Sequence, residues 1–138
     1  NADYEGPLRG RKVVLAERAH LFLTGSHAAL YSAFENVIRN ALAYTADGST
    51  VAVRLLRAGD DACITVRDHG PGVPDAELAR IFEPFYRTDS ARTRSSGGTG
   101  LGLAIAHRAV ARHGGSIVAR NADGGGLEVT ITLPLTAN

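Results

Sequence analysis

The segment from Gly97 to Leu103, which reads GGTGLGL, limits the possible folds more than any other stretch of the chain. It follows a long polar run, Arg87 to Ser96, and opens an apolar segment with helical spacing. Glycines let main-chain N–H groups approach an anion closely, and the first turn of the following helix adds unpaired amides and a positive dipole end. The segment therefore predicts a loop-to-helix junction that contacts phosphate. By itself it leaves a flexible surface loop open as the alternative.

Two common phosphate-binding motifs are excluded by the neighbouring residues. A Walker loop needs a lysine after its last glycine, but the only lysine in the chain is Lys12. A dinucleotide-binding fingerprint needs a strand directly before the glycines, whereas Arg87 to Ser96 is polar and does not alternate. We therefore expect neither a P-loop nor a Rossmann fold.

Length and composition favour one domain that spans residues 1–138. The chain has 138 residues, of which 44% are hydrophobic and 21% charged, so it can bury a core of its own. A cut at the polar run would leave a C-terminal piece too short to fold alone. The polar run is therefore expected to be a mobile loop inside a single domain.

Charge, cysteine content and hydropathy exclude several classes of protein. The net charge is +1 and no dense basic tract occurs, so a nucleic-acid surface is not indicated. The single Cys63 allows no internal disulfide and is expected to pack in the core. No apolar run reaches membrane-spanning length, which predicts that this chain is not in the membrane. The absence of methionine suggests a fragment of a longer protein.

Hydrophobic periodicity predicts a two-layer α/β (α+β) sandwich, in which about three helices cover one face of a mixed, mostly antiparallel sheet. Strands are expected at Val13–Ala16 and Leu21–Thr24 as an initial pair, at 50–57 and 62–66 as a hairpin, and at 116–120 and 127–133. Helices are expected after Ser26 through Leu42, from Pro74 toward Phe82, and from Gly100 to His113 before two glycines.

Two asparagines on the first long helix form a candidate metal site. Asn36 and Asn40 lie four residues apart, roughly 40° from each other around the helix and beside its apolar face. Asparagine lowers helix propensity, so a pair of them at the edge of a core needs a reason. Amide oxygens that hold Mg²⁺ together with phosphate oxygens and waters would be such a reason. Exposed or capping amides are the alternative.

A second candidate is Asp68, which begins the sequence DHGPG (68–72) at the end of a predicted strand. Pro71 and the glycines Gly70 and Gly72 predict a turn that holds the carboxylate in place. A fixed carboxylate can accept a hydrogen bond from the exocyclic amine of adenine, while glycines let the ring approach the backbone. An ordinary turn aspartate is the alternative.

An aromatic group precedes the polar run. Phe82, Phe85 and Tyr86 could anchor a lid whose arginines, Arg87 and Arg92 among them, meet phosphate. A hydrophobic loop anchor with solvated charges would have the same sequence.

The order of these segments, ENVIRNALAYT, DHGPG, IFEPFYR and GGTGLGL, resembles the catalytic ATP-binding domain of bacterial sensor histidine kinases. This Bergerat-fold family also includes gyrase, heat-shock protein 90 and mismatch-repair ATPases. The resemblance spans nearly the whole chain. The segments RNALAYT, FYRTDSAR and SGGTGLGLAIA are in addition similar to envelope-stress sensor kinases.

The resemblance implies a role for each matching residue, with ATP and Mg²⁺ as cofactors. Asn40, helped by Asn36, would hold the metal and serve the catalytic step, and Asp68 would bind adenine. A flexible ATP lid would span residues 86–99. The remaining nucleotide contacts would come from Tyr44, Gly70, Gly72, Phe82, Phe85, Arg87, Thr88, Gly98, Thr99, Gly100, Leu101, Gly102 and Leu103.

Two departures from the family pattern bear on the reaction. Many sensor kinases have a basic residue where this chain has Ala43, so a phosphate contact is either absent or supplied by a lid arginine. The related ATPases have a water-activating glutamate at the position of Asn36, and Glu35 points about 100° away. The sequence therefore disfavours hydrolysis and favours transfer to an acceptor that is already nucleophilic.

The implied acceptor is a histidine outside this chain. None of the five histidines has the acidic-residue-plus-proline context of a phosphoacceptor: His20, His27, His69, His107 and His113. The resemblance thus implies an upstream dimerisation and phosphoacceptor domain, a cognate response regulator, and a membrane-bound homodimeric parent whose cytoplasmic part, beneath the inner membrane, contains this domain. A hydrolysing ATPase, an anti-sigma-factor-type serine kinase and a nucleotide-sensing module without transfer are the alternatives.

Overall fold

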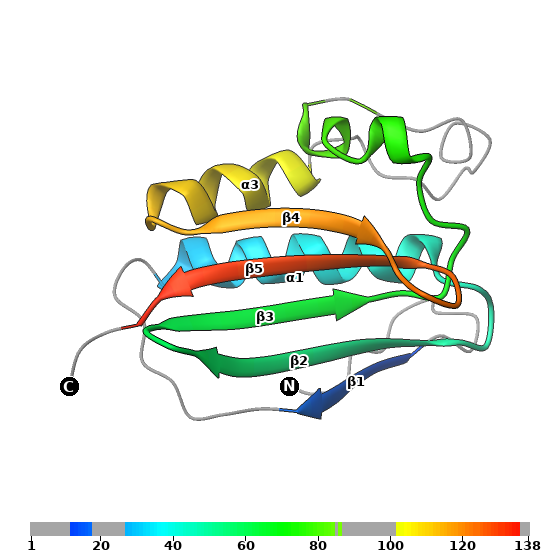
Figure 1. Cartoon of the computed structure of the whole chain (residues 1–138), viewed down its shortest axis with the longest axis horizontal. Helices are drawn as coiled ribbons and strands as arrows, with labels where there is room; N and C mark the ends of the chain where they lie inside the picture. Colours follow the sequence, from blue (N-terminus) through cyan, green and yellow to red (C-terminus); the bar gives the residue numbers. More distant parts are fainter. Residues whose placement is uncertain (1–11, 18–26, 85, 87–101, 136–138) are drawn as a thin grey trace.

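A computed structural model describes residues 12–17, 27–84, 86 and 102–135. Its centre is a sheet with the strand order β1-β2-β3-β5-β4 (Figure 1). The strands are β1 (Lys12–Glu17), β2 (Thr50–Ala58), β3 (Asp61–Arg67), β4 (Ser116–Asn121) and β5 (Leu127–Pro134). Among the described strands, β1 and β2 run parallel and the other neighbours are antiparallel. The predicted mixed, mostly antiparallel sheet is confirmed.

The hairpin of β2 and β3 follows from its alternating sequence. Ala58 pairs with Asp61 across the turn, and Gly59 there has φ of 62°. Positive φ suits the two-residue turns that match the twist of a hairpin, and glycine adopts it without steric cost. In β3 every second side chain is buried, so this strand presents one face to the core.

Two helices cover that face of the sheet, and they also pack against each other (Figure 1). They are α1 (His27–Tyr44) and α3 (Gly102–Arg112). In α1, Leu30, Ala33 and Val37 recur at three- and four-residue steps and are buried. The helix α3 ends as expected, because Gly114 has φ of 75° and the Gly115 N–H donates to the Val110 carbonyl at 3.0 Å.

The core lies between the helices and the inner face of the sheet. In the last strand Val129, Ile131 and Leu133 are at most 4% exposed, whereas Thr130 and Thr132 are half-buried on the other face. This is the predicted alternation for a sheet packed on one side. Full burial of each such side chain contributes about 1.5–3 kcal/mol.

The segment after Pro74 differs from the single short helix that we expected. It forms two 3₁₀ helices, η1 (Asp75–Glu77) and η2 (Arg80–Phe82), with bonds such as Glu77 N–H to Pro74 O at 2.8 Å. So short a segment gains little from helical cooperativity, and Pro74 supplies no side-chain cap. At the other end of the chain β1 pairs with β2, while the expected partner strand, Leu21–Thr24, lies outside the described residues.

Candidate nucleotide-binding site

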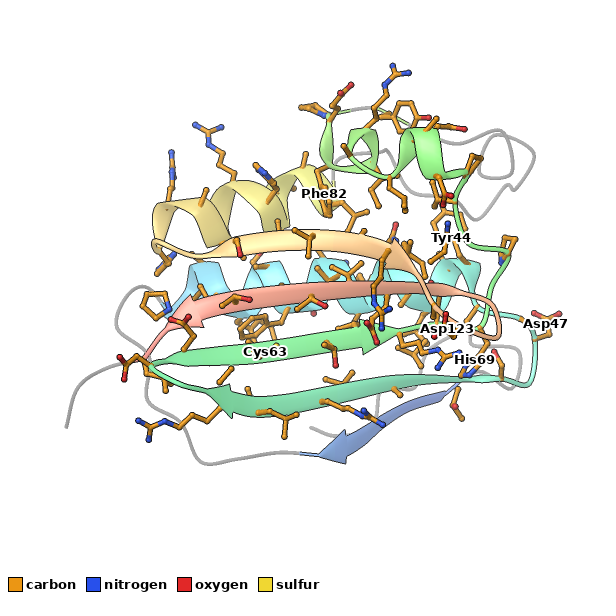
Figure 2. All side chains as sticks on the ribbon, in the orientation of Figure 1. Tyr44, Asp47, Cys63, His69, Phe82 and Asp123 are labelled. Atoms are coloured by element: carbon orange, nitrogen blue, oxygen red, sulfur yellow. The ribbon has the colours of Figure 1, made fainter. Side chains whose placement is uncertain are left out.

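The candidate site lies at the end of the sheet where β3 ends, β5 begins and α1 ends. Figure 2 shows Tyr44 and His69 at this end, whereas Cys63 lies further back along β3. The buried hydroxyl of Thr45 connects the two segments, because its Oγ1 accepts the His69 N–H at 2.9 Å. The Ala46 N–H donates to the His69 carbonyl at 3.3 Å as well. The end of α1 and the turn after β3 are therefore fastened side by side.

Asp68 is the buried carboxylate of this site, with only 2% of its surface exposed. One of its oxygens, Oδ1, accepts both the Gly70 N–H at 2.9 Å and the Leu127 N–H at 3.0 Å. Within the described residues no hydrogen bond uses Oδ2. The carboxylate is thus fixed in orientation by one oxygen and leaves the other for a ligand donor.

Burial raises the pKa of the Asp68 carboxyl above the ordinary aspartate value of 3.8. The backbone hydrogen bonds from Leu127 and Gly70 and the nearby charges of His69 and Arg67 oppose this rise without cancelling it. A ligand N–H that reached Oδ2 would add a further hydrogen bond to the ionised form and favour it.

The turn after Asp68 requires glycine for two different reasons. A Cβ on Gly70 would lie 2.2 Å from the carbonyl oxygen of Tyr44, so the turn touches the last residue of α1 directly. Gly72 has φ of 75°, and a Cβ there would lie 2.6 Å from Oδ1 of Asn121. The two glycines thus let the turn fit between α1 and β4.

The two asparagines of α1 differ in their surroundings. Asn36 donates through Nδ2 to the Ser32 carbonyl at 2.8 Å, and its Oδ1 would lie 3.2 Å from a Cβ on Gly102, the first residue of α3. The side chain of Asn40 is half-buried and has no hydrogen bond within the described residues. The Asn36 amide therefore faces the junction of α1 and α3, while the Asn40 amide remains available.

The chemistry of these donors limits how a metal could bind. Among the described residues no group of three His, Cys, Asp or Glu side chains could hold a metal ion. The donors on α1 are neutral amide oxygens, so a cation here would take most of its ligands from phosphate and water. Mg²⁺ commonly binds in this way.

Two of the three aromatic residues before the polar run, Phe82 and Tyr86, lie within the described residues and contact neighbouring elements. The ring of Phe82 lies 5.7 Å from that of His107 on α3, centroid to centroid. The Tyr86 hydroxyl donates to Glu77, and the Arg80 guanidinium lies 4.7 Å above the Tyr86 ring. The end of η2 therefore packs against α3, and Tyr86 contacts both η1, through Glu77, and η2, through Arg80.

Several predicted contacts lie outside the described residues: Phe85, Arg87, Thr88, Gly98, Thr99, Gly100 and Leu101. Of the glycine-rich segment the structure describes Gly102 and Leu103, and the Leu103 side chain is buried in the core.

The described helices contain no segment with the length and hydropathy of a membrane span.

Sequence reasoning predicted the last two strands but missed that the hairpin they form borders the site. Asn121, at the end of β4, bonds the backbone of Val73, and a Cβ on Gly126 would lie 2.0 Å from the Asp68 carbonyl oxygen. The run of three glycines at 124–126, all with positive φ, was the available signal, because so glycine-rich a turn allows close approach of another backbone.

The chain is similar in sequence to known signalling proteins. Residues 25–137 match the family model described as histidine kinase-, DNA gyrase B- and HSP90-like ATPase. Sensor histidine kinase CpxA of Escherichia coli (strain K12) is 49% identical over 113 residues, which cover 82% of this chain and 24% of CpxA. WalK of Bacillus subtilis (strain 168) is 44% identical over 102 residues, 72% of this chain and 17% of WalK. The chain thus spans about a quarter or less of these two relatives.

Solved structures of sensor kinases share the fold. The mycobacterial sensor histidine kinase MprB is 32% identical with a TM-score of 0.77, over 90% of this chain and 86% of that one. Full-length ShkA, solved in complex with AMPPNP, is 28% identical with a TM-score of 0.77, over 94% of this chain and 27% of ShkA.

Proposed function

Because the chain belongs to the family of histidine kinase-, DNA gyrase B- and HSP90-like ATPases, as the catalytic domain of a sensor histidine kinase, we propose that it binds Mg-ATP. We further propose that it transfers the γ-phosphoryl group to a histidine of a separate domain. The family resemblance expected from the four sequence segments is confirmed, and the sensor histidine kinase CpxA is among the relatives.

The observation that carries the proposal is the environment of Asp68. A buried carboxylate with one oxygen held by two backbone donors, and with no described residue bonded to the other, is suited to an amine of a flat ring. Gly70 and Gly72 let the turn beside this carboxylate pack closely against Tyr44 and Asn121, and they would border the ring. Adenine combines such an amine with such a ring, and ShkA, a relative with the same fold, was solved with AMPPNP.

The phosphate end of the nucleotide would lie toward Asn40 and the first turn of α3. The Asn40 amide oxygen would be a ligand of Mg²⁺, helped by Asn36, which lies one turn earlier on α1 and faces the first residue of α3. Unpaired amides at a helix N-terminus attract phosphate, and the sequence GGTGLGL leads into that terminus. Bound Mg²⁺ would neutralise charge on the phosphate oxygens. Arg87, Thr88 and the glycines before α3 would complete the contacts.

Transfer is favoured over hydrolysis because neither Asn36 nor Glu35 of α1 is suited to activate a water molecule. Asn36 cannot accept a proton from water, and its Nδ2 already donates to the Ser32 carbonyl. Glu35 is next to it, but its carboxylate lies 3.7 Å from Arg39 on the outer side of the helix. An imidazole nitrogen needs no activating base, so positioning and charge neutralisation suffice.

In the proposed step the imidazole nitrogen of the acceptor forms a bond to the γ-phosphorus. The bond from that phosphorus to the bridging oxygen breaks, and ADP leaves with the electron pair. The acceptor histidine would belong to the dimerisation and phosphoacceptor domain of a homodimeric parent, which would pass the phosphoryl group on to a response regulator. The domain would lie on the cytoplasmic side of an inner-membrane sensor.

The test combines calorimetry with a transfer assay. Mg-ATP should bind to the isolated chain, and radiolabel from γ-labelled ATP should appear on a separately added acceptor domain, stable to alkali and labile to acid. Sustained phosphate release by the chain alone would support an ATPase instead. Acid-stable label on a serine would support an anti-sigma-factor-type kinase, and binding with no transfer in the full-length protein would support a sensing module.

A further inference from the structure

We propose that Asn121, the last residue of β4, is a positioning residue for the adenine end of the site. This inference rests on the proposed function. Asn121 Oδ1 accepts the Val73 N–H at 2.8 Å, and its Nδ2 donates to the Val73 carbonyl at 2.6 Å. Both polar groups of one backbone residue are therefore held by one side chain. The two residues are 48 positions apart, so the contact joins the turn after Asp68 to the β4–β5 hairpin.

The identity of the side chain matters for this contact. An amide presents an acceptor and a donor on the same planar group, and it can bond the N–H and the C=O of one residue simultaneously. A carboxylate at this position would keep the bond from the Val73 N–H but lose the one to the Val73 carbonyl. It would also lie beside the Asp75 carboxylate, which now accepts from Nδ2 of Asn121 at 3.0 Å.

The backbone around the contact is shaped to fit it. A Cβ on Gly72 would lie 2.6 Å from the Asn121 Oδ1, so only glycine lets the turn come so near to the amide. Across the hairpin, Gly126 approaches the Asp68 backbone in the same way, and its carbonyl accepts the Ala122 N–H at 2.8 Å. The β4–β5 hairpin thus contacts the turn after β3 at two points, at Asp68 and at Val73.

Between these two points lie the residues proposed to surround the base. The Asp68 carboxylate meets the exocyclic amine, and Gly70 and Gly72 border the ring. If the turn is released at Val73, its glycines gain freedom and the angle between the ring and Oδ2 of Asp68 is no longer fixed. Asn121 therefore acts through the turn, and its loss should weaken recognition of the base more than that of the phosphates.

The experiment measures recognition of the amine itself. Calorimetry would compare Mg-ATP with the triphosphate of purine riboside, which lacks the exocyclic amine, and with inorganic tripolyphosphate as a probe of the phosphate end. Wild-type protein should prefer ATP over the purine riboside triphosphate by about tenfold or more. Asn121→Ala and Asn121→Asp should both reduce that ratio to about threefold or less, with tripolyphosphate affinity unchanged.

Two control variants separate this role from general effects on the hairpin. Arg120→Gln removes the neighbouring ion pair with Glu128, whose atoms are 2.7 Å apart, and should keep the full preference for ATP. Asp75→Ala removes only the exposed hydrogen bond from Asn121 Nδ2 to the Asp75 carboxylate, and this variant should also keep the full preference for ATP. A preference that survives in both Asn121 variants would overturn the inference, and so would an equal loss in Arg120→Gln.

A measurement on wild-type protein covers the case in which the Asn121 variants do not fold. Amide hydrogen exchange at Val73 should slow when Mg-ATP binds. The adenine ring would stabilise the turn, and with it the hydrogen bond from the Val73 N–H to Asn121. An unchanged rate at saturating Mg-ATP would overturn the inference. Wild-type protein that fails to bind ATP, or to prefer it, would refute the proposed function instead, so the two failures are distinguishable.

Discussion

At Asp68 one carboxylate has to satisfy opposing requirements of folding and binding. Its burial favours the neutral acid and raises its pKa, whereas acceptance of an adenine amine needs an unprotonated oxygen. The two backbone donors on Oδ1 keep the group oriented in either case. Binding and stability should therefore respond in opposite directions to loss of its charge.

The substitution Asp68→Asn separates these two responses. A hydrogen bond to a charged group contributes about 1.5–3 kcal/mol, so ATP affinity should fall by about ten- to one-hundred-fold. The unfolding temperature at neutral pH should stay the same or rise, because the variant no longer buries a charge. Calorimetry and thermal unfolding check the two halves, and a large fall in the unfolding temperature would show that the carboxylate is mainly structural.

The pH dependence of stability follows from the direction of the pKa shift. Since the folded-state pKa of Asp68 is raised, the folded protein binds this proton more tightly than the unfolded chain does. The resulting stabilisation is fully present below the ordinary aspartate value and is lost as pH rises through the raised pKa. The unfolding free energy of wild type relative to Asp68→Asn should thus decline with pH across that window, as denaturant titrations at several pH values would measure. A difference independent of pH would contradict the shift.

At the scale of elements, the turn after β3 is defined by its contact with α1. Gly70 has an ordinary backbone conformation, yet a Cβ there would lie 2.2 Å from the Tyr44 carbonyl oxygen. Gly48 presents the opposite case, with φ of 77° and nothing within 4 Å of an added Cβ. The two glycines thus distinguish steric contact between elements from local backbone strain.

Alanine at these two positions should have different effects on ligand binding. Gly48→Ala should lower the unfolding free energy by about 1–2 kcal/mol, the cost of a left-handed backbone, and leave ATP affinity unchanged. Gly70→Ala must move the turn away from α1 and should lower ATP affinity at least tenfold, because Asp68 moves with the turn. Denaturant unfolding and calorimetry on both variants make the comparison. Equal affinities would mean that the turn can shift without disturbing the site.

Elements with local signals were predictable, and those set by distant contacts were not. The buried faces of α1 and β5 follow from three- and four-residue steps and from alternation, which depend only on neighbours in sequence. The 3₁₀ helices between Pro74 and Phe82 are too short for a hydrophobic period to define them, and the parallel pairing of β1 with β2 depends on the packing of distant segments. Periodicity carries no information about such packing.

The same distinction applies to the site. Asp68 could be found because a strand terminus followed by a glycine turn is visible locally, and the structure places it there, buried. Asn121 could not be found, because its partner Val73 is 48 residues away and neither residue belongs to a recognisable motif. The roles assigned to the remaining nucleotide contacts stay predictions.

For the whole molecule, the elements that meet at the site should be stabilised together by the nucleotide. The turn after Asp68 contacts both α1 and the β4–β5 hairpin, so a ligand that holds the turn links the helical layer to the sheet. A ligand that binds only the folded state stabilises it by an amount set by its concentration relative to Kd. Nucleotide binding should thus raise the stability of the entire domain.

The last prediction concerns the share of this stabilisation that depends on metal. At a concentration of one hundred times Kd, Mg-ATP should add about 2.7 kcal/mol to the unfolding free energy, a rise of several degrees in the unfolding temperature. Removal of Mg²⁺ with a chelator should abolish most of this rise, since the neutral amides of α1 cannot offset the triphosphate charge. Asn40→Ala should lower the rise with Mg²⁺ present and leave the small metal-free rise unchanged. If instead this variant lost both equally in thermal unfolding, Asn40 would contact the nucleotide directly rather than through the metal.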